Sequence, residues 1–193
     1  MDARSFVRSG SLFLIGLAIA MPLLVLAPAR AIAAPRVVDP QEIALSPADL
    51  PSGFVVDASN TGRTVLPDGA GELYRVDMKR QPTTESVADG PVIVQQLVLR
   101  VDPSVPAAEM LAFVRDEIVR EAGMRPTTDG PNDGGTVSLK RQDGDVTLYS
   151  IGFAKDQMVI FTTTGGLSAA TTFPKLVELA GISSAKLDAA LVR

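Results

Sequence analysis

The C-terminal half of the chain contains three apolar, strand-like segments joined by links too short for anything but hairpins. The segments are 137–141, 146–154 and 158–163, and the links are 142–145 (QDGD) and 155–157 (KDQ). A parallel pair of strands needs a crossover of about a dozen residues or more, whereas an antiparallel pair needs only a tight turn. The pattern therefore predicts a three-stranded antiparallel meander, which constrains every fold open to this chain.

Two further strands are predicted upstream of the meander. In 72–81, Tyr74, Val76 and Met78 alternate with charged residues, which is typical of a strand with one wet face. A longer apolar run at 92–101 follows after a short polar loop, so the two strands are expected to pair antiparallel. A short strand is also expected at 54–56.

Helical spacing appears between these two groups of strands and again at the C-terminus. A helix is predicted from Pro106 to a C-terminal cap at Gly123, and a second from Pro174 to a stop at Gly181, followed by a short helix at 185–191. Strands, helix, strands and helix in this order favour an α+β fold over a parallel doubly wound one. We expect an antiparallel sheet of about five or six strands with helices packed on it.

The N-terminus has the features of an export signal. Arg4 and Arg8 precede a charge-free apolar run at 11–29, and Ala31 and Ala33 occupy the two positions that a signal peptidase inspects. We predict a signal peptide at 1–33, cleaved after Ala33, and hence a secreted or cell-envelope protein. The alternative is a retained N-terminal membrane anchor, because the run approaches the roughly 20 residues needed to cross a bilayer.

The mature chain divides into a leader and one domain. Residues 34–49 contain Pro35, Pro40 and Pro47 and few large apolar side chains, which predicts a proline-rich leader on the surface. Residues 50–191 are then expected to form a single α+β sandwich domain.

Composition excludes much familiar chemistry. The chain has no Cys and no His, which removes disulfides, thiol nucleophiles, Cys-ligated metals and the commonest general base. Without the charged residues of the signal (Asp2, Arg4, Arg8 and Arg30), 18 basic and 22 acidic residues become 15 and 21, and the net charge changes from −4 to −6. Such a balance argues against nucleic acid as a partner.

The phrase at 45–54 (LSPADLPSGF) resembles the opening of small exported bacterial domains of unknown function that share a "DLPxGF" motif. The layout of elements over 45–191 is similar, more distantly, to the α/β/α sandwich of PsbP-like proteins. That resemblance implies an extrinsic partner or ligand-binding module and assigns no site residue.

Ser183 and Lys186 form a Ser-x-x-Lys spacing, which places a hydroxyl and an amine on one helical turn in penicillin-recognising enzymes. The chain has no Lys-Thr-Gly element, and a serine that caps the last helix explains the same residues. An acid pair of the glycosidase type is the other catalytic option, but spacing along the chain shows no convergence of two acids.

Ligands for ions are no better defined. Asp129, Asn132 and Asp133, or Asp143 with Asp145, offer oxygens to calcium, yet neither stretch has the EF-hand register, and turns demand these residue types. Thr162–Gly166 ends a strand in two glycines but lacks the lysine and spacing of a phosphate loop.

The remaining charged and aromatic residues suggest surface and core roles. The pairs Lys79-Arg80 and Lys140-Arg141 are interpreted as outward-facing charges that protect sheet edges, rather than as an anion site. The aromatic residues are expected in the core rather than on a sugar-stacking platform (Phe54, Tyr74, Phe113, Tyr149, Phe153, Phe161 and Phe173).

We therefore expect no catalytic residue, no metal site and no cofactor. The function most consistent with the sequence is a non-catalytic binding or interaction module, whose partner is an envelope protein or a small ligand, with the membrane involved only if the signal is retained. The alternative is a small secreted hydrolase using carboxylate or Ser/Lys chemistry.

Overall fold

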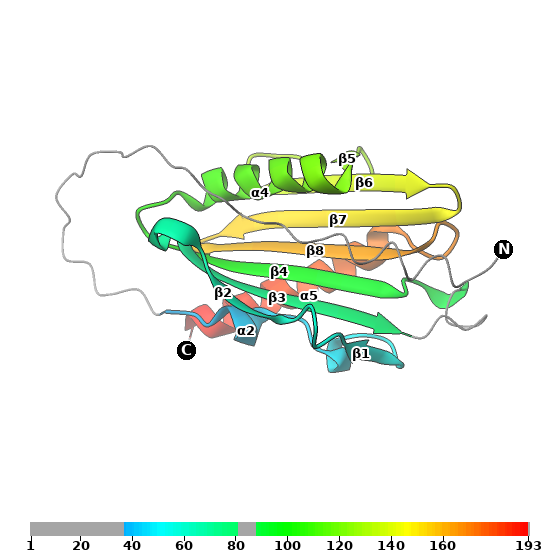
Figure 1. Cartoon of the computed structure of the whole chain (residues 1–193), viewed down its shortest axis with the longest axis horizontal. Coiled ribbons are helices and arrows are strands. Elements are labelled where there is room, and N and C mark those ends of the chain that lie inside the picture. Colours follow the sequence, from blue (N-terminus) through cyan, green and yellow to red (C-terminus); the bar gives the residue numbers. More distant parts are fainter. Residues whose placement is uncertain (1–36, 81–87, 193) are drawn as a thin grey trace.

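The computed structural model describes residues 37–80 and 88–192 (Figure 1). The helical elements of these residues are α2 (Pro40–Ile43), the 3-10 turns η2 (Pro47–Asp49) and η3 (Pro67–Gly69), α4 (Ala107–Ala122) and α5 (Phe173–Val192). The strands are β1 (Phe54–Val56), β2 (Gly62–Val65), β3 (Gly71–Arg80), β4 (Ile93–Val101), β5 (Arg125–Pro126), β6 (Thr136–Asp143), β7 (Val146–Lys155) and β8 (Met158–Leu167).

The fold is α+β, and its strands form one antiparallel sheet. Over the described ranges the sheet has eight strands in the order β1-β3-β4-β8-β7-β6-β5, and β2 pairs with β3 along the same side as β1 does. The expected number of five or six strands was too low. Sequence patterns reveal strands that have one buried face, and β2 and β5 have no such face. Every residue of β2 is exposed, and β5 is two residues long, so only their pairing with β3 and β6 makes them strands.

The meander is confirmed as β6, β7 and β8. The β6–β7 hairpin closes between Asp143 and Val146, and the β7–β8 hairpin closes between Lys155 and Met158. Gly144 and Asp156 have positive φ angles of 59° and 52°, and such backbone is common in two-residue hairpin loops. The short links thus determine both pairing and register.

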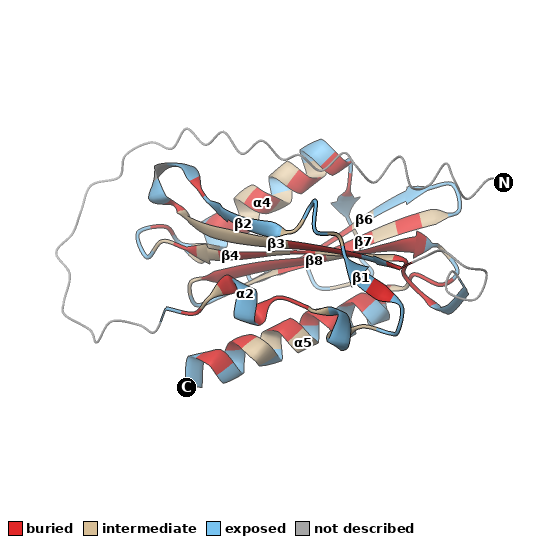
Figure 2. Cartoon of the chain, turned by 60° about the horizontal axis from the view of Figure 1, so that its bottom comes forward, coloured by how far each residue is buried: buried red, intermediate tan, exposed pale blue. Residues whose placement is uncertain are grey.

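Two helical layers cover opposite faces of the sheet, as the turn from Figure 1 to Figure 2 shows. α4 buries Met110, Leu111, Val114 and Ile118 in one cluster with side chains of β4, β6 and β8. On the other face α5 and the segment before β1 pack on β3, β4 and β8. α4 ends at Gly123 in the left-handed conformation (φ 62°), as its sequence predicted.

The C-terminal helix differs from its prediction. α5 runs without interruption from Phe173 to Val192, through Gly181, where a stop was expected. Gly181 is exposed and a Cβ there meets nothing within 4 Å, so the glycine lies on the outer side of the helix. Leu176, Leu179 and Leu187 on the buried side hold both halves against the sheet, and this packing outweighs the cost of about 1 kcal/mol for a glycine in a helix.

The expected surface leader is also corrected. Val38, Ile43, Ala44 and Leu45 are buried in the cluster beneath α5, and Ile43 is fully buried. Asp39 and Ser46, which precede Pro40 and Pro47, are extended, as predicted, but the prolines themselves begin α2 and η2, and they do not keep the segment out of the core. The packed unit therefore begins before residue 50, and includes residues assigned to the leader.

The predicted signal peptide, its cleavage site at Ala33 and residues 34–36 lie outside the described residues. Among the helices of 37–80 and 88–192, none has the length and apolarity required to span a membrane.

Candidate functional site

The structure gives Ser183 and Lys186 different hydrogen-bond partners. Ser183 lies on the buried side of α5, fully inaccessible to solvent, and its Oγ accepts a hydrogen bond of 2.7 Å from Nε2 of Gln96. Nε2 also donates to Thr162 Oγ1 at 2.9 Å, while Oε1 accepts from the backbone N–H of Leu45 at 2.7 Å. We call these four residues the Gln96 network. It joins β4, β8, α5 and the segment before β1, and gives Ser183 a structural role.

Lys186 is committed elsewhere. Its Nζ lies 2.6 Å from Asp49 Oδ2 and donates to the carbonyl of Ala44 at 3.0 Å. Partial burial works to raise the pKa of Asp49, but hydrogen bonds from Lys186 and from Ser46 outweigh it and hold that pKa below its ordinary value. Asp49 belongs to the "DLPxGF" phrase, so in this chain the phrase anchors the N-terminal segment to α5.

The candidate calcium ligands are used in local turns. Asn132 donates to the carbonyl of Thr127 at 2.6 Å and accepts from the N–H of Ser138 at 2.8 Å, and Asp133 accepts from the N–H of Gly135. Asp129 lies 3.4 Å from Lys140 Nζ, and Asp143 lies 3.3 Å from Arg141. In the part of the chain that the structure describes, no three Asp or Glu residues gather as metal ligands would.

The two residues of each cationic pair point to opposite faces of the sheet rather than both facing outward. Lys79 is exposed and pairs with Asp57 at 2.8 Å, but Arg80 is only 9% exposed, with its guanidinium 5.4 Å from the centre of the Phe54 ring. Arg80 Nε also donates to the carbonyl of Pro91 at 3.1 Å. The expectation of two outward charges was wrong here because consecutive residues of a strand point to opposite faces.

Thr162, Gly165 and Gly166 lie within β8, so they form no phosphate loop. Gly166 is required for close packing, since a Cβ there would lie 2.6 Å from Thr171 Oγ1 and 3.2 Å from Pro91 Cα.

A row of polar side chains crosses four strands on the α4 side of the sheet, and sequence reasoning missed it. Asp77, Gln95, Thr163 and Ser150 are successive cross-strand partners on β3, β4, β8 and β7. Gln95 donates to Asp77 at 3.0 Å, Thr163 donates to Ser150 at 2.9 Å, and Arg75 contacts Asp77 at 2.6 Å. Asp77 and Ser150 are buried, so the row acts mainly as an internal set of hydrogen bonds.

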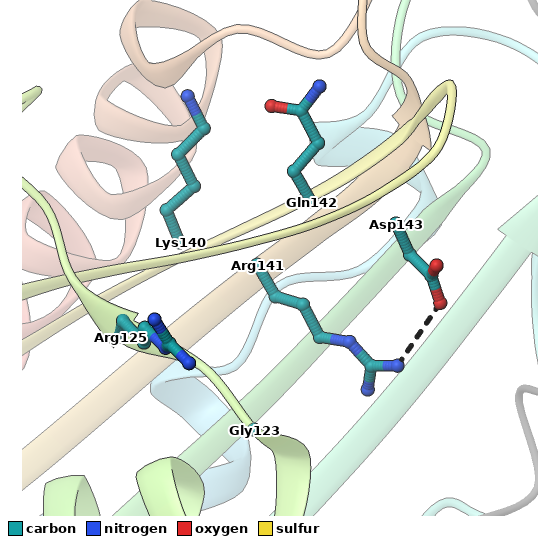
Figure 3. A pocket seen from close by; sticks show the side chains of 6 residues that line it. All are labelled: Gly123, Arg125, Lys140, Arg141, Gln142 and Asp143. Carbon is teal, nitrogen blue, oxygen red and sulfur yellow. Dashed lines mark hydrogen bonds and ion pairs between the residues drawn. The ribbon is translucent and has the colours of Figure 1, made fainter.

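Among the described residues, one candidate for a ligand site is an open hollow of about 420 Å³ at the β5–β6 edge of the sheet, beside the end of α4. It is lined by residues from three elements and their links: Gly123, Arg125, Lys140, Arg141, Gln142 and Asp143. Figure 3 shows Arg141 and Asp143 projecting to the α4 side of β6, while Lys140 and Gln142 project to the other side. We call this feature the edge hollow.

The two arginines of the edge hollow differ in the number of interactions that their guanidinium groups make. Arg141 Nη1 donates to the carbonyl of Ala122, at the C-terminus of α4, at 3.0 Å, and Nη2 lies 3.3 Å from Asp143. Arg125 is exposed on β5, and within the described residues no ion pair or hydrogen bond engages its guanidinium. The edge hollow thus joins one fixed and one unengaged guanidinium.

Lys140 contributes its charge on the opposite side of β6. Its Nζ lies 5.1 Å from the centre of the Tyr149 ring and 3.4 Å from Asp129. Interaction with Tyr149 raises the pKa of Lys140 against a smaller opposing effect of burial, and Asp129 adds to the increase. Lys140 therefore stays charged, and its ammonium group contacts Tyr149 and Asp129 on the side of β6 away from Arg141.

The edge hollow was missed because its residues come from 123–125 and 140–143, which are distant in sequence. The one local signal was the Lys140-Arg141 pair. Neither a scan against protein-family models nor a search of curated proteins matches this chain.

Proposed function

We propose that this chain is an exported, non-catalytic binding module of the cell envelope or the secreted fraction. Its partner is a small ligand or an envelope protein, and the edge hollow is the place of binding. The export features of 1–33 support the location.

The observation that carries the proposal is the unengaged Arg125 in a polar hollow beside a rigid sheet. Binding sites fix orientation with a few convergent polar groups on a preformed scaffold, and β6 is held by its full register with β7. An exposed guanidinium at such a place is available to a ligand without the loss of an existing ion pair.

The candidate nucleophile of the alternative hydrolase has a simpler role. Ser183 is inaccessible and bonded to Gln96, and Lys186 pairs with Asp49. A Ser/Lys mechanism needs the amine within hydrogen-bonding distance of the hydroxyl and substrate access to both. The inaccessible hydroxyl therefore counts against a Ser/Lys mechanism at this position.

The test uses the absence of cysteine from the chain, which makes an engineered thiol the single point of labelling. Asp143→Cys, labelled with a bulky uncharged maleimide, obstructs the edge hollow on the side to which Arg141 projects, and the unlabelled variant measures the effect of removing the carboxylate alone. Thr64→Cys, on exposed β2 at the opposite edge of the sheet, carries the same label as the matched control.

Unlabelled protein is screened by thermal shift against sugars, peptides, lipids, metal ions and organic anions. A ligand at a hundred times its dissociation constant is expected to add about 2.7 kcal/mol to the free energy of unfolding. We expect the shift to disappear in labelled Asp143→Cys and to persist in unlabelled Asp143→Cys and in labelled Thr64→Cys. A shift that survives obstruction places binding elsewhere, and turnover of an ester, glycoside or peptide substrate overturns the binding proposal itself.

A further inference from the structure

We infer that the edge hollow binds an oxyanion, a carboxylate or phosphate group, between Arg125 and Arg141. This inference rests on the proposed function and names the chemical class of its ligand.

The charge of the edge hollow is opposite to that of the whole chain. Its lining contains three cations and one acid, whereas the mature chain is acidic. Lys140 is occupied by Asp129 and Tyr149, so Arg125 and Arg141 remain to face a ligand. Guanidinium groups present forked N–H donors that match carboxylate and phosphate oxygens, and such charge-assisted bonds are about twice as strong as neutral ones.

Arg141 is prepared for such a ligand. Its bond to the carbonyl of Ala122 uses Nη1 and fixes the guanidinium at the end of α4, where a glycine with no side chain, Gly123, leaves room. A held arginine loses less conformational entropy on binding than a free one, so Arg141 is the orienting group and Arg125 the mobile one.

Asp143 is the competitor. Its carboxylate lies 3.3 Å from Arg141 Nη2, and both side chains are largely exposed, at 75% and 45%. Exposed pairs of this kind contribute little, about 0–1 kcal/mol, so an incoming oxyanion can displace Asp143. Removal of this carboxylate therefore strengthens oxyanion binding.

The experiment is a titration of the full mature chain with sodium phosphate and sodium citrate, followed by backbone amide chemical shifts. We expect saturable changes confined to 123–125 and 140–143. Arg125→Gln and Arg141→Gln are each expected to weaken binding by about tenfold, and Asp143→Asn to strengthen it several-fold.

Matched controls change the same charges elsewhere. Arg115→Gln and Asp116→Asn alter an exposed ion pair in the middle of α4 and should leave the affinity within about twofold. Arg141→Gln removes the bond to the carbonyl of Ala122 and could disturb the end of α4. Arg125 makes no such bond, so Arg125→Gln tests the site without this disturbance. Equal effects from the control variants would show a general dependence on net charge and overturn the inference.

Two further arms identify the source of the oxyanion. Vesicles of phosphatidylglycerol, compared with phosphatidylcholine, test a lipid headgroup, and the soluble salts test a free anion. If the protein sediments with anionic vesicles and the Arg125→Gln and Arg141→Gln variants do not, the oxyanion is a lipid headgroup. If only the soluble salts saturate the site, the oxyanion is a free anion.

The outcomes separate this inference from the proposed function. If a sugar or peptide binds and is blocked by the label at position 143 while phosphate, citrate and anionic vesicles do not bind, the binding module stands and the oxyanion inference is overturned. If nothing binds at the edge hollow, both are overturned.

Discussion

At the residue scale, the buried side chain of Gln96 makes three hydrogen bonds in the core. It is fully buried, and its amide serves Leu45, Thr162 and Ser183 together. Gln96→Leu keeps a similar volume but leaves these groups without partners, at about 1–3 kcal/mol for each buried group left unpaired. We expect a loss of about 3 kcal/mol or more in urea unfolding. Gln142→Leu, at an exposed position, is the control and should change stability by less than about 0.5 kcal/mol.

The core leaves no room for a side chain at Gly152. A Cβ there would lie 2.3 Å from Cε1 of Phe161, its buried cross-strand partner on β8. Gly152→Ala is therefore expected to cost about 1–3 kcal/mol by forcing the ring from its position. Thermal unfolding of this variant with and without Phe161→Leu measures the clash, because the smaller side chain should recover part of the loss. A Gly152→Ala variant of unchanged stability contradicts this packing.

At the scale of elements, α5 provides the opposite prediction for a glycine. Gly181 lies within the helix with nothing near its would-be Cβ, and it is exposed. Gly181→Ala should stabilise the protein by about 0.5–1 kcal/mol, since alanine restricts the unfolded chain and favours the helix. Denaturant midpoints measure the change. A loss of stability would show that the helix needs a break at this position, as its sequence first indicated.

The attachment of the segment before β1 to α5 makes stability depend on pH. The pKa of Asp49 is below its ordinary value in the folded state, so its contribution is present above the unfolded-state pKa of about 4 and is lost as pH falls through the lower folded-state pKa. Asp49→Asn should cost about 1 kcal/mol at pH 7. The difference from wild type should narrow below about pH 4. A difference in stability that stays constant as the pH falls would contradict the role of Lys186.

At the scale of the whole molecule, residues 37–50 and the sheet form one packed unit. The N–H of Leu45 is bonded to a fully buried side chain of β4, and Ile43 is inaccessible. We expect the Leu45 amide to exchange hydrogen as slowly as the amides at the centre of β8, through global unfolding alone. Hydrogen exchange by NMR measures both. Fast exchange at Leu45 with slow exchange in β8 would restore the surface leader that the prolines suggest.

Local pattern in the sequence was enough to predict much of the sheet and one helix. Strand-like apolar runs joined by short, turn-like links predict β6, β7 and β8, because a short link leaves two strands little freedom in pairing. Gly123 predicts the end of α4 because a left-handed cap needs a residue without a Cβ. In each case the information lies within a few residues of the element.

The remaining features depend on residues that meet only after folding. β2 is a strand because β3 lies beside it, Gly181 stays helical because three leucines of α5 pack on the sheet, and Ser183 is structural because Gln96 lies 87 positions earlier and reaches it. The edge hollow likewise joins the link after α4 to the far end of β6. The sequence by itself determined the elements that are stabilised by interactions between residues close together in the chain. The tertiary structure alone decided which polar groups are buried together and which, like Arg125, remain available, because burial and long-range hydrogen bonds are set by the packed whole.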